Sequence, residues 1–295
     1  MDVLSSPQLV FSALVLGSLY SLIALGLNLV YGTMRLLNIA HGDLIMVGAY
    51  ASFWFFTLSG ISPLVGLPLV AVITATLGLV LYFGIFRHQL SGIERVEQIE
   101  ANSLLLFFGV SVLVQNIVAM AFSGSPRAYR FLDNVYEFSG LMMTGNRIAV
   151  LLIAAILLIS VAIFLTRSQY GLSISALIQN QNAARIVGIN VSRLQLISFV
   201  AGFALAGIAG VLVSMTEQIS PFMGFPFTIA AFVVIILGGL GNIKGGIIAG
   251  MLLGFAEIYV VVLTSANFRS MLLYGLFVGI LLLRPEGLLG KTRRR

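Results

Sequence analysis

The sequence predicts an all-α, polytopic membrane protein with roughly eight to ten transmembrane or re-entrant helices. Apolar residues make up 59% of the 295-residue chain and charged residues only 9%. Soluble domains average about 45–50% apolar and ~25% charged residues. A chain so poor in charge cannot cover its own surface in water, so lipid must solvate much of it.

Apolar runs recur along the whole chain, and some are short or interrupted by glycine. The candidate spans are 9–31, 43–58, 63–86, 101–122, 148–166, 195–213, 227–241, 246–263 and 270–284. No linker separates them, so residues 1–295 are expected to form a single transmembrane domain without a sizeable soluble part. The start, "MDVLSSPQ", carries Asp2 and no basic residue, which argues against a cleavable signal.

Basic residues predict the orientation of the chain. The net charge is +6, but the positive residues lie between spans and in the tail rather than in one patch, which is typical of positive-inside anchoring. The C-terminal tail and the 167–194 loop are therefore expected in the cytoplasm, and the 214–226 segment, without Lys or Arg, outside. Nine spans would place the N-terminus outside.

Two stripes of small residues predict close helix packing. Gly246, Gly250 and Gly254 recur every four residues on one face, and Gly202, Ala206 and Gly210 do the same on an earlier span. Such stripes let helix backbones approach closely in lipid. They are expected to build the bundle rather than to bind substrate.

A short repeated pattern suggests two related halves. "NIAHGDLIMVGAY" begins at residue 38 and "NIKGGIIAGMLLG" at residue 242. Both place Asn-Ile-x-x-Gly before a helix rich in small residues, and transporters often contain such internal repeats. Chance similarity in a glycine-rich membrane protein is the alternative.

The first of these patterns contains the candidate pathway residues Asn38, His41, Gly42 and Asp43. Polar groups at membrane depth are costly unless they face protein or water. Gly42 permits a helix break, and Asp43 could cap a helix starting near Leu44. The segment is therefore either a broken helix beside a pathway or a short cytoplasmic turn with ordinary capping.

No constellation for catalysis, metal binding or nucleotide binding is visible. The chain has no cysteine and two histidines, and it lacks HExxH and Gly-x-Ser-x-Gly motifs. "GKT" at 290–292 ends like a P-loop, but Pro285 replaces the first glycine. Glu257, alone in an apolar span, is interpreted as a buried packing residue, with a functional carboxylate as the alternative. We expect no catalytic residue, metal or cofactor on this chain.

The polar stretch "QNQNAARIVGIN" at 179–190 lies between two hydrophobic spans. In a helix, Ala184 and Gly188 would form a smooth patch bordered by Ala183, and Gly188 would end the helix. Such a helix can lie in a groove of a cytosolic partner, with Arg185 adding a charge contact.

The frame of this stretch resembles the "EAA" coupling loop of permeases in ABC importers, although Asn182 replaces the usual Glu and the trailing Leu-Pro is missing. "GLNLVYGTMRLLNIAHGDLIMVGAY" (26–50), "ISPFMGFPFTIAAFVVIILGGLGNIKGGIIAGMLLGFAE" (219–257) and "LLLRPEGLLG" (281–290) are similar to hallmarks of the permeases for branched-chain amino acids. The matches span nearly the whole chain in the same order.

The resemblance implies an importer with a second related permease, two cytosolic ATPase subunits that carry ATP and Mg²⁺, and an external binding protein. It implies a bacterial or archaeal inner membrane, and coupling through Ala183, Ala184, Arg185 and Gly188. The same family also serves urea, short amides and other amino acids. A secondary transporter or channel without ATP is the alternative from another class, and a membrane-embedded enzyme is a third.

Overall fold

The computed structural model describes residues 6–87, 95–138, 140–265 and 267–283, and a helix corresponds to each of the nine predicted apolar runs. The elements in chain order are α1 (Pro7–Met34), α2 (His41–Ser59), α3 (Pro63–Leu81) continued by the π-helical turn η2 (Tyr82–Phe86), α5 (Val96–Phe122), β1 (Val135–Phe138), β2 (Leu141–Thr144), α6 (Gly145–Arg167), α7 (Gln169–Gln179), α8 (Gln181–Ile186), α9 (Val191–Ser214), α10 (Gly224–Gly238), α11 (Ile243–Leu263) and α12 (Phe268–Leu283).

Within the described part of the chain, six helices are long and apolar enough to cross a membrane: α1, α3 with η2, α5, α6, α9 and α11. The helices α10 and α12 are apolar but shorter. The prediction of an all-α polytopic membrane protein is confirmed.

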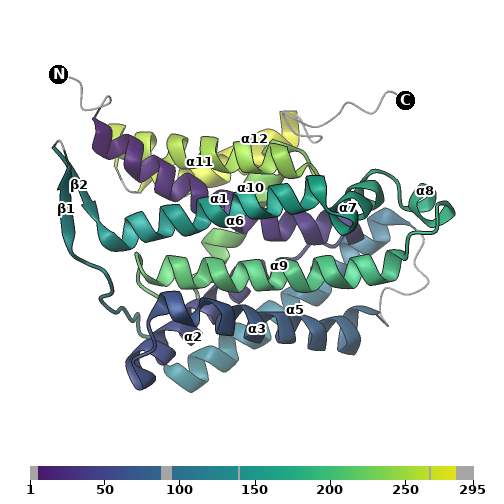
Figure 1. Ribbon diagram of the computed structural model, residues 1–295, viewed down its shortest axis with the longest axis horizontal. Coiled ribbons are helices and arrows are strands. Elements are labelled where there is room, and N and C mark those ends of the chain that lie inside the picture. Colours follow the sequence, from purple (N-terminus) through teal and green to yellow (C-terminus); the bar gives the residue numbers. More distant parts are fainter. Residues whose placement is uncertain (1–5, 88–94, 139, 266, 284–295) are drawn as a thin grey trace.

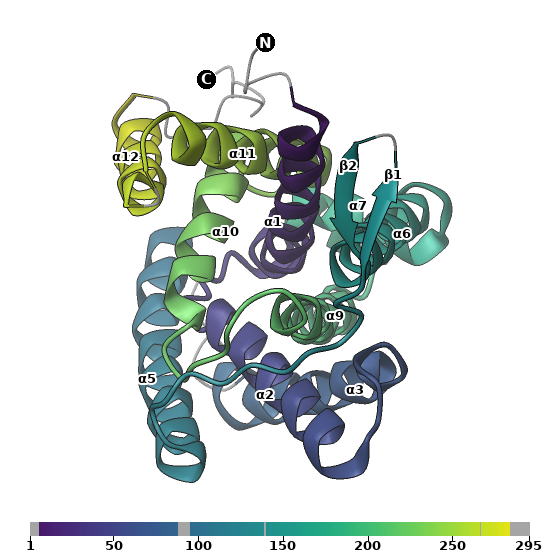
Figure 2. The same cartoon turned by 90° about the vertical axis from the view of Figure 1, so that its left-hand side faces the viewer.

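Helices α1 and α9 form the centre of the bundle (Figure 2). About two-thirds of their most apolar stretch is buried (67% for each), compared with 22% for α3, α5 and α6. Helix α1 begins with Ser6 as its N-cap, whose hydroxyl accepts a hydrogen bond from the Leu9 amide, and Pro7 in its first turn. The outer helices therefore leave most of their apolar side chains without cover from this chain.

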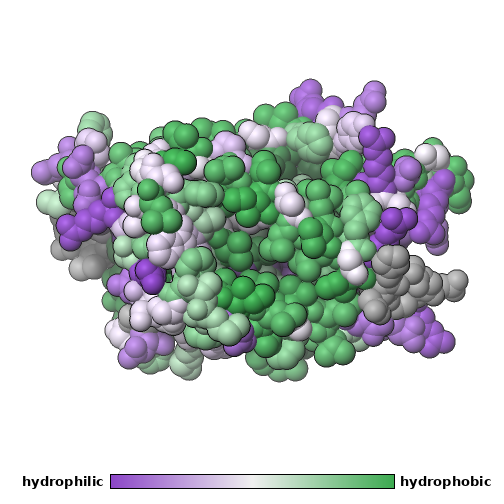
Figure 3. Space-filling model, turned by 90° about the horizontal axis from the view of Figure 1, so that it is seen from below, coloured by the Kyte–Doolittle hydropathy of each residue, from purple (hydrophilic) through white to green (hydrophobic). Residues whose placement is uncertain are grey.

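The face of the molecule seen in Figure 3 is hydrophobic in its middle and hydrophilic at its two ends, and exposed apolar side chains on the outer helices extend this hydrophobic belt. On α5, Leu105 is 70% and Leu113 63% exposed, and Ile156 on α6 is 61% exposed. Leaving a large aliphatic side chain in water rather than burying it forfeits about 1.5–3 kcal/mol. This belt is suited to lipid or to another membrane subunit, and the protein is a multi-pass membrane protein.

The small-residue stripes pack helices together as predicted. Gly250 on α11 contacts Ser21 on α1, and Gly254 contacts Gly17 one turn further along. The Ser21 hydroxyl also donates to the Ile247 carbonyl at 2.9 Å. Because the numbers rise along α11 as they fall along α1, the two helices are antiparallel.

The two ends of the bundle carry different structures (Figure 1). A β1–β2 hairpin lies beside the start of α1, where the Met142 amide donates to the Gln8 side chain at 3.2 Å. Helices α7 and α8 lie at the opposite end, to the right in Figure 1. The hairpin was not predicted because its strands have only four residues each. Strand β1 is exposed throughout, and β2 buries Leu141 and Met143 only in part.

Candidate translocation site and coupling helix

The chain reverses direction after α1 and places the first turn of α2 inside the bundle. Helix α1 ends at Met34, and Arg35 adopts a left-handed conformation with φ 58°. His41 then lies against the middle of α1, where its Nε2 is 2.9 Å from the Ile23 carbonyl oxygen. Asn38 and His41 have no exposed surface. The chain is therefore broken between α1 and α2 inside the bundle, and the start of α2 lacks the ordinary side-chain cap that a simple turn would have.

The details of this break differ from the sequence-based expectation. The helix begins at His41 rather than near Leu44, and Asp43 lies in its first turn instead of capping it. Ala40 occupies the cap position without a side-chain hydrogen bond. Thr228 on α10 replaces a local cap: its hydroxyl accepts from the Gly42 amide at 2.9 Å and donates to the Ile39 carbonyl at 3.0 Å. No local pattern could reveal a partner so distant in sequence.

Asp43 connects α2 to α5. Its carboxylate is 2% exposed and accepts a hydrogen bond from the Gln115 amide at 2.8 Å, and the same amide group donates to Ser111 at 3.1 Å. The predicted pathway residues Asn38, His41, Gly42 and Asp43 thus form one buried region between α1, α2, α5 and α10. The Asn38 amide and His41 Nδ1 have no hydrogen-bond partner within the described residues.

Asn28 on α1 holds the corresponding turn before α11. Its side-chain oxygen accepts from the Gly241 amide at 2.8 Å, and its nitrogen donates to the Asn242 carbonyl at 3.0 Å. Thr228 on α10 therefore holds the α1–α2 break, and Asn28 on α1 holds the α10–α11 turn. The asparagines of the two repeated patterns have different roles. The Asn242 side chain caps α11, whereas Asn38 caps no helix.

Thr228→Val tests whether the α10 hydroxyl holds the break. Valine keeps the shape of threonine but leaves the buried Gly42 amide without an acceptor, which costs about 1–3 kcal/mol. We expect a lower thermal midpoint of the detergent-solubilised protein and slower transport. Thr76→Val on α3 is the control, since the exposed Thr76 hydroxyl bonds only the Val72 carbonyl in its own helix. An equal effect of both substitutions would contradict the role of Thr228.

The predicted coupling stretch forms the short helix α8 at the end of a helical hairpin with α7. Asn180 caps α8 by accepting from the Ala183 amide at 3.0 Å. At its other end the Gly188 amide donates to the Arg185 carbonyl and the Ile189 amide to the Ala184 carbonyl, which is the Schellman pattern. Gly188 supplies the required left-handed residue, with φ 83°.

The surface of α8 differs from the predicted smooth patch. Ala184 is only 2% exposed and packs within this chain, so it does not share a free face with Gly188. Ala183, Arg185 and Gly188 are exposed. The most exposed apolar residues here are Ile186 at 85% and Val187 at 73%, which were not among the residues predicted to couple. The sequence feature that could have identified Ile186 and Val187 is an apolar pair at the end of a short polar helix.

Glu257 is a buried residue with partners, as the packing interpretation predicted. It forms an ion pair with Arg269 of α12 and accepts a hydrogen bond from the Tyr20 hydroxyl at 2.6 Å. Arg269 is also 4.0 Å from Glu217 in the loop before α10. These contacts join α1, α11 and α12 at the end of the bundle opposite α8.

A helical bundle with a lipid-compatible belt, a helix broken inside it and an exposed loop helix at one end is typical of membrane transport proteins. Residues 9–281 match the family described as the permease component of the branched-chain amino acid transport system. The chain belongs to this family.

Curated relatives cover nearly the whole chain. BraD of Pseudomonas aeruginosa, a high-affinity branched-chain amino acid transport system permease protein, is 30% identical over 96% of this chain and 95% of its own. LivH of Escherichia coli K12 is 30% identical over the same shares, 96% and 95%. LivM of Escherichia coli K12 is 28% identical over 93% of this chain and 68% of its own. No solved structure matches the chain significantly.

Proposed function

We propose that this chain is one of two related permease subunits of an ATP-driven importer for branched-chain amino acids. The observation that carries the proposal is the similarity over nearly the full length to permeases such as BraD and LivH. The second permease is proposed because the chain is also similar to LivM, which together with LivH is found in Escherichia coli. An external binding protein would deliver the substrate, and two cytosolic ATPase subunits would carry ATP and Mg²⁺.

The end with α7 and α8 is proposed to face the cytoplasm of a bacterial or archaeal cell. Among the described residues, the basic ones at this end are Arg35, Arg87, Arg95, Arg167, Arg185, Arg193 and Lys244, and the acidic ones are Glu97 and Glu100. The opposite end carries Arg127, Arg130, Arg147 and Arg269 together with Asp133, Glu137 and Glu217. The excess of positive charge at the α8 end supports this orientation.

The buried region around Asn38, His41, Gly42 and Asp43 is proposed to border the translocation pathway. A buried amide without a partner costs about 1–3 kcal/mol in the described conformation. A second arrangement of the bundle that brings Asn38 to water or substrate would recover this free energy. Such differential contacts are what a switch between outward and inward openings requires.

Uptake in proteoliposomes tests the function. The chain would be reconstituted with its co-encoded ATPase, second permease and binding protein, and radiolabelled leucine and urea compared with and without internal ATP. ATP-dependent leucine uptake is the expected result. ATP-dependent urea uptake would keep the mechanism and change the substrate, and uptake independent of ATP would contradict the proposal.

Helix α8 is proposed to transmit the motion of the ATPase subunits through Ile186 and Val187, with Ala183 and Arg185 beside them. Ile186→Asp places a charge where an apolar side chain would enter a groove of the partner. We expect ATPase activity stimulated by the binding protein to fall by at least roughly tenfold, which corresponds to about 1.4 kcal/mol of lost coupling. Gly188 is a poorer target, because any side chain would be strained at its positive φ.

Ser173→Asp on α7 is the control for Ile186→Asp, since Ser173 is half-buried at the same end and its hydroxyl bonds only the Gln169 carbonyl. Its stimulated ATPase activity should remain at the level of the unaltered protein. Full activity of the Ile186→Asp variant would remove α8 from the coupling mechanism.

A further inference from the structure

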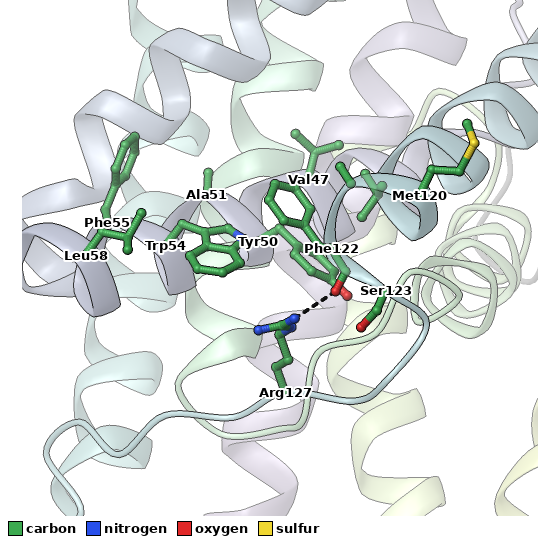
Figure 4. A pocket seen from close by; sticks show the side chains of 12 residues that line it. Val47, Tyr50, Ala51, Trp54, Phe55, Leu58, Met120, Phe122, Ser123 and Arg127 are labelled. Carbon is green, nitrogen blue, oxygen red and sulfur yellow. Dashed lines mark hydrogen bonds between the residues drawn. The ribbon is translucent and has the colours of Figure 1, made fainter.

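A cavity of about 860 Å³ lies between α2 and the final turns of α5, at the end of the bundle opposite α8. Its walls are mostly aliphatic and aromatic side chains, including Val47, Phe55, Val118 and Phe122. Figure 4 shows Tyr50 and Trp54 of α2 and Phe122 of α5 gathered beside the guanidinium of Arg127. Arg127 comes from the loop after α5, which is tied to the loop before α10 by backbone hydrogen bonds of 2.8 Å between Arg127 and Ile219.

Three polar side chains of the cavity, Arg127, Tyr50 and Trp54, each have a hydrogen-bond donor without an acceptor among the described residues. One Arg127 nitrogen donates to the Phe122 carbonyl at 2.8 Å, whereas its Nε has no partner within the described chain. The Tyr50 hydroxyl and the Trp54 indole N–H are likewise buried and unpaired among these residues, and Tyr50 is only 2% exposed. The guanidinium lies 5.2 Å from the Trp54 ring centre, so it is held in place by cation–π contact.

These features specify the chemistry of an occupant. No Asp or Glu is among the lining residues, so the charge of Arg127 is not neutralised within the cavity. A carboxylate fits planar guanidinium donors and strengthens their hydrogen bonds through its charge. The aromatic and aliphatic walls fit an apolar side chain next to that carboxylate. Ligand cavities of about 300–1,000 Å³ are typical for small molecules.

We infer that Arg127, Tyr50 and Trp54 form an outer binding site for the substrate, in which the α-carboxylate meets Arg127 and the branched aliphatic side chain packs against Trp54 and Phe122. This inference rests on the proposed function, since it assigns the site to an imported amino acid. The ammonium group of the ligand faces the open mouth of the cavity, where water solvates it.

Asp43 is the next acceptor along the same pair of helices. It precedes Tyr50 by seven residues on α2, which places it about 10 Å deeper at 1.5 Å per residue. A single bound amino acid is too short to reach both Arg127 and Asp43. Asp43 is buried, paired with Gln115 and outside the lining of the cavity, so the outer site ends before it.

Fluorescence reports directly on the site, because Trp54 is the single tryptophan of the chain. Leucine would be titrated into the purified full chain in phosphatidylcholine vesicles. We expect a saturable change of Trp54 emission with leucine, and binding at least roughly tenfold weaker with leucinamide, which lacks the carboxylate, and with glycine, which lacks the apolar side chain. No leucine response, or equal responses to all three, would overturn the inference.

A second experiment with phosphatidylglycerol vesicles tests whether the cavity binds lipid instead, since a lipid phosphate is also an anion attached to apolar chains. Replacement of the phosphatidylcholine by phosphatidylglycerol should leave the emission and the leucine response unchanged. A spectral change with the anionic lipid together with loss of the leucine response would show that the groove holds lipid and would overturn the inference.

Variants connect the site to transport. Arg127→Gln should abolish the leucine response and raise the KM for leucine uptake of the reconstituted importer by roughly tenfold or more. Tyr50→Phe removes only an unpaired hydroxyl, so the protein should fold normally and show a smaller rise in KM. Arg130→Gln, on the same loop and exposed, is the control and should change neither quantity.

The two proposals fail in different ways. If the unaltered importer shows no ATP-dependent leucine uptake, the proposed function is wrong. If uptake is normal and both Arg127→Gln and Tyr50→Phe keep the KM and the leucine response of the unaltered chain, the outer site is wrong and the function stands.

Discussion

Replacement of Gly42 by alanine is expected to destabilise the protein by about 1–3 kcal/mol or more, the range for overpacked cores. A methyl group at this position would overlap the Gly224 carbonyl oxygen of α10 and crowd the Thr228 hydroxyl. Both contacts hold the first turn of α2 in place, and a backbone carbonyl cannot move aside as a flexible side chain can. The α2–α10 crossing must therefore open, and transport should be lost with it.

Helix propensity alone predicts the opposite sign, because alanine in a helix is more favourable than glycine by about 1 kcal/mol. The thermal midpoint of the solubilised protein and leucine uptake decide between the two effects. Gly109→Ala on α5 is the matched control, since nothing lies within 4 Å of its added methyl group. A Gly42→Ala variant as stable as the Gly109→Ala variant would show that α2 and α10 do not touch at this point.

Arg269→Ala is expected to destabilise the protein by about 3–5 kcal/mol, the cost of leaving one partner of a buried ion pair uncompensated. Glu257 is 2% exposed and would retain only the Tyr20 hydroxyl as a hydrogen-bond donor among the contacts described. The Arg269 side chain is 38% exposed. If the charge of Glu257 is removed instead, water can still solvate the unpaired guanidinium, so the cost is smaller. Glu257→Gln should therefore be milder than Arg269→Ala.

The double variant Glu257→Gln/Arg269→Ala separates the ion pair from simple loss of packing. Removal of the buried charge together with its partner should restore much of the stability that Arg269→Ala loses, measured as the thermal midpoint of the solubilised protein. Arg147→Ala, at the same end and exposed, is the control. Additive losses in the double variant would mean that Glu257 and Arg269 stabilise the protein independently.

Short-range patterns predicted the helices and their packing faces. Hydropathy indicated the nine helical runs because lipid requires about 20 apolar residues in each long span. The spacing of Gly246, Gly250 and Gly254 indicated a contact face because side chains four residues apart lie on one side of a helix. The structure then supplied the partners, Ser21 and Gly17 of α1.

The partners of the polar residues could not be read from the sequence. Thr228 is 186 residues away from Gly42, Asn28 is 213 residues away from Gly241, and Gln115 is 72 residues away from Asp43. The burial of Ala184 was likewise not predictable, since its position on a short helix suggested a solvent-exposed face. Its burial depends on neighbouring parts of the fold that no local pattern specifies.

Composition, helical periodicity and local motifs were sufficient to predict a polytopic helical permease of this family, the positions of its helices and two of their packing faces, because each of these properties is set within a single segment of the chain. Three features required the folded structure: the start of α2 inside the bundle, the exposure of Ile186 and Val187 on α8, and the meeting of Tyr50, Trp54 and Arg127 at one cavity. Each of them depends on where segments that are distant in sequence come into contact.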